Sequence, residues 1–100
     1  MAVSITADRV SSNRTRHTAS RTPDGWSVTW LPGRVLTRDE ATTAVLLAES
    51  VVTFGHLPRT SRTWALIDGW AAELDLTGAE VAARVSRVPA ARVRRAGSWL

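Results

Sequence analysis

The stretch Thr63 to Val88, TWALIDGWAAELDLTGAEVAARVSRV, predicts two short helices separated by a tight turn. Thr60 or Ser61 can cap the first helix, because a hydroxyl oxygen accepts from a free amide of the first turn. Thr77 begins a second helix as part of a capping box, TGAE. Two helices joined in this way are typical of a helix-turn-helix, and also of any two packed helices. Both interpretations stay open at this point.

The turn itself has the features of a helix-turn-helix corner. Ala71 is the small residue expected where the helices cross, and Val81 is the branched residue that closes the corner. Asp75 stands at the turn position where Gly is usual, which is tolerable because Asp adopts the left-handed conformation more readily than most residues. Gly78 weakens the start of the second helix.

A short β-hairpin is expected before this helical unit. Trp26, Val28 and Trp30 alternate with polar residues, which predicts a strand with one apolar face. Pro and Gly in the LPGR stretch, Leu31 to Arg34, predict a type II turn, after which residues 34–36 return as a second strand. We expect the tryptophans before the C-terminal tail to supply the aromatic bulk of the core: Trp26, Trp30, Trp64 and Trp70.

A longer helix is predicted between the hairpin and the helical pair. Thr37 and Glu40 form its capping box, and Gly55 is its expected C-terminal cap. Its apolar stripe recurs at three- and four-residue spacing through Ala41, Ala44, Val45, Ala48, Val51 and Val52. The sequence therefore predicts an α+β fold, with a short N-terminal β-hairpin packed on a three-helix unit, in a single globular domain spanning 25–88.

Basic charge is concentrated at the two ends of the chain. The net charge is +4, with 13 basic residues, all of them Arg. Residues 1–24 hold four Arg and two Asp, 25–80 four Arg and seven acids, and 81–100 five Arg and no acid. We expect residues 1–24 to be a flexible basic arm, with a short strand at 3–5 as the alternative, and 89–100 to be a basic tail.

The composition argues against several classes of function. The chain has no Cys, and His17 and His56 lack the spacing of a metal site. It shows no phosphate-binding Gly loop, nucleophile elbow or pair of catalytic acids. We therefore expect a non-enzymatic protein with no cofactor, metal or small-molecule substrate. The absence of a long apolar run predicts a cytoplasmic protein without a membrane partner.

Two blocks, WSVTWLPGRVLTRDEATTAVLLAE and WAAELDLTGAEVAARVS, carry a resemblance to a group of small proteins encoded by actinobacteria and their phages. In that group a W-x-V-x-W-L-P-G-R block precedes an L-T-x-x-x-A helix and a W-A-A-E-L-x-L segment. The likeness covers Gly25 to Val88. It implies an actinobacterial or phage origin and transfers no site residues. LTRDEA and the hairpin also resemble excisionase-type winged modules, although there the helix-turn-helix usually precedes the wing.

Two classes of function remain open. The first is a DNA-binding accessory or regulatory protein of phage or mobile-element type, with Thr77 and Glu80 as base readers. Its phosphate contacts are expected from Arg84, Arg87, Arg92, Arg94 and Arg95. The second is a protein–protein interaction module: a homodimer, an adaptor or a structural component of a virion. Its expected contacts are Leu66, Trp70 and Trp99.

Overall fold

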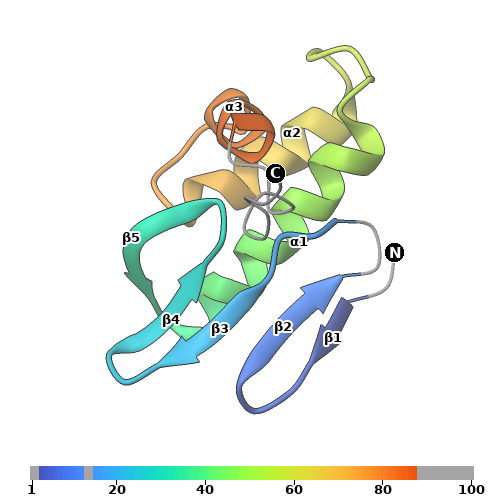
Figure 1. Ribbon diagram of the computed structural model, residues 1–100. Helices are drawn as coiled ribbons and strands as arrows, with labels where there is room; N and C mark the ends of the chain where they lie inside the picture. Colours follow the sequence, from blue (N-terminus) through green and yellow to red (C-terminus); the bar gives the residue numbers. More distant parts are fainter. Residues whose placement is uncertain (1–2, 13–14, 88–100) are drawn as a thin grey trace, which may run out of the picture.

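The computed structural model describes residues 3–12 and 15–87, which form a five-stranded antiparallel sheet and three helices (Figure 1). The strands lie side by side in their sequence order, so the sheet is a simple meander. This confirms the α+β class. The elements are β1 (Val3–Ile5), β2 (Arg9–Ser12), β3 (Ala19–Thr22), β4 (Gly25–Val28), β5 (Leu31–Leu36), α1 (Arg38–Phe54), α2 (Arg62–Ala72) and α3 (Gly78–Arg87).

Helix α1 lies at the centre of the fold. It contacts all five strands on one side and also packs against α2 and α3 (Figure 1). The predicted capping box is present, since the Thr37 hydroxyl accepts from the Glu40 amide and the Glu40 carboxylate accepts from the Thr37 amide. Gly55 caps the other end, in a right-handed conformation with φ −61°. These caps fix where the central helix begins and ends.

The buried part of α1 is wider than the predicted stripe. Ala41, Ala44, Val45 and Ala48 are buried as expected. Leu47, Glu49 and Ser50 are buried as well, because α1 is covered by the sheet and by two helices. Val52 is predicted to belong to the stripe, but its side chain is 53% exposed. The packing of α1 between two layers therefore decides which of its residues are buried.

The prediction of a flexible arm over residues 1–24 is wrong for the described residues, which form β1, β2 and β3. The alternative, a strand at 3–5, is confirmed by β1, Val3–Ile5. Val10 and Ala19 are register partners on neighbouring strands, and both are fully buried. Each short strand carries few buried apolar residues. The apolar–polar alternation that would predict a strand is therefore not recognisable among its Ser, Thr and Arg residues. Pairing with β4 and packing against α1 provide the stability that the local sequence lacks.

The hairpin is present, but its turn lies three residues earlier than predicted. Val28 pairs with Leu31, so Thr29 and Trp30 form the two-residue loop between β4 and β5. Pro32 and Gly33 lie inside β5, where the register shifts between the pairs Val28–Leu31 and Trp26–Leu36. Gly33 has φ +87°, and Pro lacks a donor for the ladder, so this bulged position suits an edge strand.

Three of the four tryptophans expected in the core are buried, namely Trp26, Trp30 and Trp64. The Trp30 indole donates to the Ala44 carbonyl at 3.0 Å, which ties the β4–β5 loop to α1. The Trp64 indole donates to the Leu57 carbonyl, also at 3.0 Å. Trp70 is the exception, because 38% of it is exposed. Among the four tryptophans before the C-terminal tail, Trp70 is therefore the one that the core does not enclose.

The turn between α2 and α3 has the conformation that the sequence predicts. Asp75 adopts φ 59°, in the left-handed region, and Ala71, Leu74 and Val81 are fully buried around the corner. Arg34 of β5 donates to the Leu74 carbonyl at 2.8 Å, which joins the sheet to this turn. The two helices therefore form a packed pair supported by the sheet.

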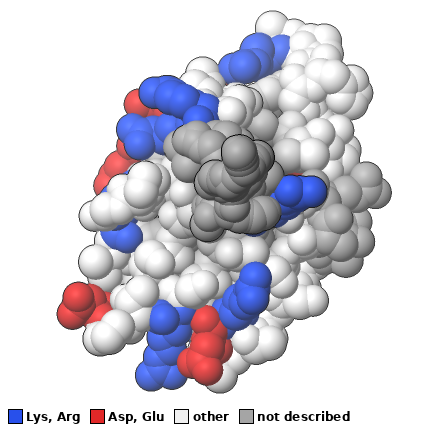
Figure 2. All heavy atoms as spheres, viewed as in Figure 1, with Lys and Arg blue, Asp and Glu red and all other residues white. Residues whose placement is uncertain are grey.

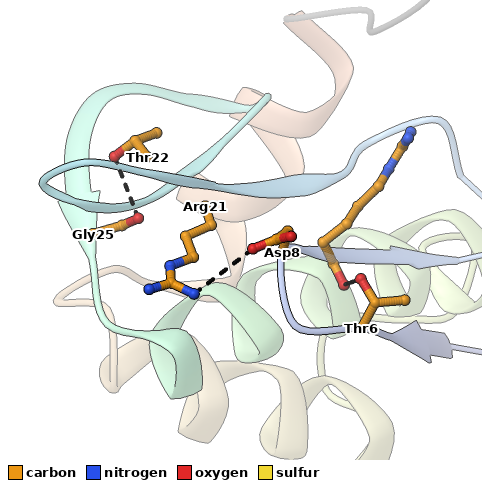
Figure 3. A network of polar contacts seen from close by, with 6 residues as sticks. Thr6, Asp8, Arg21, Thr22 and Gly25 are labelled. Carbon is orange, nitrogen blue, oxygen red and sulfur yellow. Dashed lines mark hydrogen bonds and ion pairs between the residues drawn. The ribbon is translucent and has the colours of Figure 1, made fainter.

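Polar contacts also link the β1–β2 connection to β3 and bridge the β3–β4 turn (Figure 3). Arg21 reaches from β3 to Asp8 in the β1–β2 connection, and their charged groups lie 3.7 Å apart. The two side chains are 63% and 79% exposed, so water screens the pair and it adds little stability. Thr22 donates to the Gly25 carbonyl across the next turn. These contacts shape the turns rather than a binding site.

Candidate protein-interaction site

Helix α2 presents two large apolar side chains to solvent. The Ser61 hydroxyl caps the helix by accepting from the Trp64 amide, and Trp64, Ile67 and Ala71 turn inward. On the outer face, Leu66 is 59% exposed and Trp70 is 38% exposed. Both are partner contacts predicted from the sequence, and the structure brings them together on one helix face.

These two side chains border an apolar groove between α1 and α2, which we call the α1–α2 groove. Its volume is about 100 Å³. Ile67 is 1% exposed and forms part of its base. The groove is lined by Ser50 and Phe54 of α1 and by Thr63, Leu66, Ile67 and Trp70 of α2. An apolar groove is one of the surfaces that accept an apolar helix face of a partner, and Trp is enriched among the residues that anchor protein interfaces.

Opposite charges stand at the two ends of α2. Arg62 is exposed at its first turn, and Glu73 is exposed at its C-cap. The Arg59 guanidinium lies over the Trp64 ring, 4.1 Å from the ring centroid, in a cation–π contact just before the helix begins. The outer face of α2 is therefore basic at one end, apolar in the middle and acidic at the other end.

The residues predicted to bind DNA are only partly placed by the structure. Arg84 and Arg87 are exposed on α3, as expected. Thr77 and Glu80 are exposed too, but each serves the capping box: the Thr77 hydroxyl accepts from the Glu80 amide and the Glu80 carboxylate accepts from the Thr77 amide. Arg92, Arg94, Arg95 and the predicted partner contact Trp99 lie outside the described residues.

Acidic side chains gather around the start of α3. Asp68, Asp75 and Glu80 are all exposed, and Asp68 accepts from the Gly78 amide at 2.7 Å. Carboxylates at the start of a helix repel phosphate, so this end of α3 is unfavourable for a DNA backbone. Figure 2 shows basic and acidic groups in small separate clusters on the face it presents, without a continuous basic surface among the coloured atoms.

His17 is a buried link that sequence reasoning missed, because the arm around it was expected to be flexible. Its ring is 4% exposed, with Nδ1 2.8 Å from the Thr29 hydroxyl and Nε2 3.2 Å from the Val85 carbonyl. A carbonyl only accepts, so Nε2 carries the proton and Nδ1 accepts from Thr29. Burial lowers the pKa of His17 below its usual 6.5, and the bond to Val85 opposes this shift in part.

Glu49 is a second buried polar residue that the apolar pattern of α1 did not reveal. It is fully buried, and its Oε1 accepts from the Ser12 hydroxyl at 2.5 Å, which joins β2 to α1. Its Oε2 and the Thr53 hydroxyl one turn later have no hydrogen-bond partner among the described residues. Neither polar group lines the α1–α2 groove.

Among residues 3–12 and 15–87, no three His, Asp or Glu side chains gather in a way that could hold a metal ion. In the same part of the chain, no helix has the length and apolar character to span a bilayer. Comparison with protein-family models, with curated proteins and with solved structures finds no match to the chain.

Proposed function

We propose that this protein is a non-enzymatic interaction module that binds a segment of protein in the α1–α2 groove. The observation that carries the proposal is the exposure of Leu66 and Trp70, 59% and 38%, beside an apolar hollow. Burying these side chains against a partner removes apolar surface from water, which is the main driving force for association. Single exposed apolar residues are ordinary, whereas Leu66 and Trp70 are neighbours on one helix face and border the same apolar groove, which supports the proposal.

Trp70 differs from the buried tryptophans among the described residues. Trp30 and Trp64 are both buried, and both indole nitrogens donate to backbone carbonyls. Trp70, by contrast, is 38% exposed and lines the α1–α2 groove. A large aromatic side chain that packs incompletely within its own domain is typical of an interface anchor.

Photo-crosslinking tests this proposal even while the partner is unidentified. A photoreactive benzoylphenylalanine replaces Leu66, and a matched control carries it at Ala83, an exposed position on α3 away from the groove. We expect covalent protein adducts in living cells from position 66 and few from position 83. If position 66 yields no adduct, or no more than position 83, the groove is not a protein-binding site.

DNA binding by α3 is the second candidate function, and the exposure of Arg84 and Arg87 favours it. Phosphate contacts from these side chains, together with the arginines after Val88, would give affinity that falls steeply with salt. The test is a titration of random duplex DNA at several salt concentrations with the full chain and with the Arg84→Glu, Arg87→Glu variant. Absence of binding at low salt would end this candidate.

A further inference from the structure

We infer that the partner of the α1–α2 groove is a second copy of this chain, and that the two α2 helices pack antiparallel about a two-fold axis. This inference rests on the proposed function, because it names the occupant of the groove. Three observations carry it: the arrangement of the outer face of α2, the order of charges along it, and a glycine that the fold does not require.

The outer face of α2 is a single continuous stripe. Successive residues of an α-helix are about 100° apart, so Arg62, Leu66, Gly69, Trp70 and Glu73 fall within an arc of about 100°. All five are exposed. The stripe therefore presents apolar side chains at its centre and one charge at each end.

This order of charges is complementary to itself when two copies run in opposite directions. With the two-fold axis at the middle of α2, Arg62 of one copy meets Glu73 of the second copy, and the same pair forms again at the other end. Leu66 then meets Gly69 of the second copy. A parallel arrangement would instead place Arg62 against Arg62, and it would align the two helix dipoles unfavourably.

No contact among the described residues requires a glycine at position 69. A Cβ at position 69 would have no atom within 4 Å, and its φ does not lie in the left-handed region. At Gly78, by contrast, a Cβ would lie 2.5 Å from Asp68 Oδ1 and 3.2 Å from the Trp64 ring. A glycine inside an exposed helix lowers stability, so open space beside Gly69 suits a close approach by another molecule. In the antiparallel pair that space receives Leu66 of the second copy.

The groove extends the contact beyond α2 itself. Ser50 and Phe54 of α1 form its far wall, so the apolar side chains of each copy cover part of the groove of the other. A pair of helices alone would bury little surface. With α1 residues included, each copy contributes surface from two helices, so the interface is larger and its orientation is better fixed.

The first measurement is the molar mass of the full chain in solution, by sedimentation velocity over a range of concentrations. We expect a reversible dimer with twice the 10.9 kDa mass of the chain. A protein that stays monomeric up to concentrations on the order of 100 μM would overturn the inference.

Charge reversal then tests the antiparallel pairing. Arg62→Glu and Glu73→Arg each oppose like charges at both ends of the dimer, and we expect each to weaken dimerisation about tenfold or more. Both changes suit the helix dipole, so the fold should not suffer. An equimolar mixture of the two variants restores both pairs and should dimerise like the wild type. If neither variant affects a dimer, or if the mixture fails to dimerise, the pairing is wrong.

A substitution at the glycine tests the close approach. Gly69→Gln places a polar side chain on the stripe without adding apolar surface, and we expect it to weaken dimerisation about tenfold. Ala65→Gln is the matched control, since Ala65 is exposed on α2 but falls outside the stripe. Equal effects of the two substitutions on dimerisation would contradict the inference.

The crosslinking experiment separates this inference from the function on which it rests. An adduct from position 66 with the mass of two chains supports both. An adduct with a different protein, formed by a chain that is monomeric in solution, overturns the second copy and keeps the proposed function. Without any adduct from position 66, both fail.

Discussion

The ring of His17 and the carbonyl oxygen of Val85 lie 3.2 Å apart, although 68 residues separate them in the sequence. This hydrogen bond joins the segment before β3 to α3. The Thr29 hydroxyl holds the other ring nitrogen and accepts from the Thr18 amide. The imidazole is therefore fixed by two elements at once, so its protonation state affects how α3 is held.

We predict that stability falls as the pH drops below about 6.5, the ordinary His value. The folded state lowers the pKa of His17, chiefly by burial, so below that pH the unfolded chain binds more protons. The contribution of neutral His17 to the free energy of unfolding is fully present above this pH. It decreases as the pH falls toward the folded pKa, with a slope of at most about 1.4 kcal/mol per pH unit. Urea unfolding at several pH values between 8 and 5 measures this pH dependence of the free energy of unfolding. The His17→Gln variant should lack this slope; if its slope equals that of the wild type, His17 is not the cause.

Two glycines on neighbouring helices should respond in opposite directions to alanine. Gly78→Ala forces a Cβ against the Asp68 carboxylate and the Trp64 ring, and we expect a loss of about 1–3 kcal/mol. Gly69→Ala meets open space and should gain about 0.5–1 kcal/mol from helix propensity. Thermal unfolding of dilute protein compares them. A stabilising Gly78→Ala would show that the start of α3 is packed more loosely against α2 than these distances require.

Replacing tryptophan by phenylalanine should destabilise the protein more at the buried Trp30 than at the partly exposed Trp70. Trp30 is fully buried and its indole donates to the Ala44 carbonyl, so Trp30→Phe removes both volume and a hydrogen bond, at a cost of about 2–4 kcal/mol. Trp70→Phe should cost less than about 0.5 kcal/mol, because Trp70 is partly exposed. Denaturant titration checks the difference. Similar losses for both variants would mean that Trp70 supports the folded chain.

We expect Thr77 to stabilise the protein through its role as the N-cap of α3. Thr77→Ala removes the acceptor for the Glu80 amide and should cost about 1 kcal/mol, whereas Thr77→Asp keeps an acceptor and should cost little. Unfolding free energies of the three proteins give the comparison. Because an added carboxylate would itself repel phosphate, the neutral Thr77→Asn, which also keeps a cap acceptor, is the variant assayed for DNA binding: a loss of affinity at unchanged stability would indicate that Thr77 reads bases.

The helical half of the fold could be predicted because its signals are local. The capping boxes at Thr37 and Thr77, and the left-handed Asp75, are each set by residues within one turn. The N-terminal strands could not be predicted in this way. Val10 becomes a core residue only because it pairs with Ala19 and because β2 packs against α1, and neither relationship is visible from residues near Val10.

The candidate site was predictable in part. Leu66 and Trp70 stood out as surplus apolar residues on a helix that is apolar around most of its circumference. Sequence alone could not decide which Trp faces outward, and Trp70 was also expected in the core. The difference depends on where α1 and α3 cover α2, and that is a property of packing. The freedom around Gly69 likewise appears only once its neighbours are placed.

The bulge at Pro32 and Gly33 affects how copies of this protein meet. A meander leaves unpaired backbone groups on its first and last strands. Such edge strands can pair with strands of other molecules, which can lead to fibrils. Pro32 has no amide hydrogen to offer an incoming strand, and the shifted register at Gly33 breaks the regular spacing that such a strand would need. Both features disfavour the addition of another strand at the β5 edge.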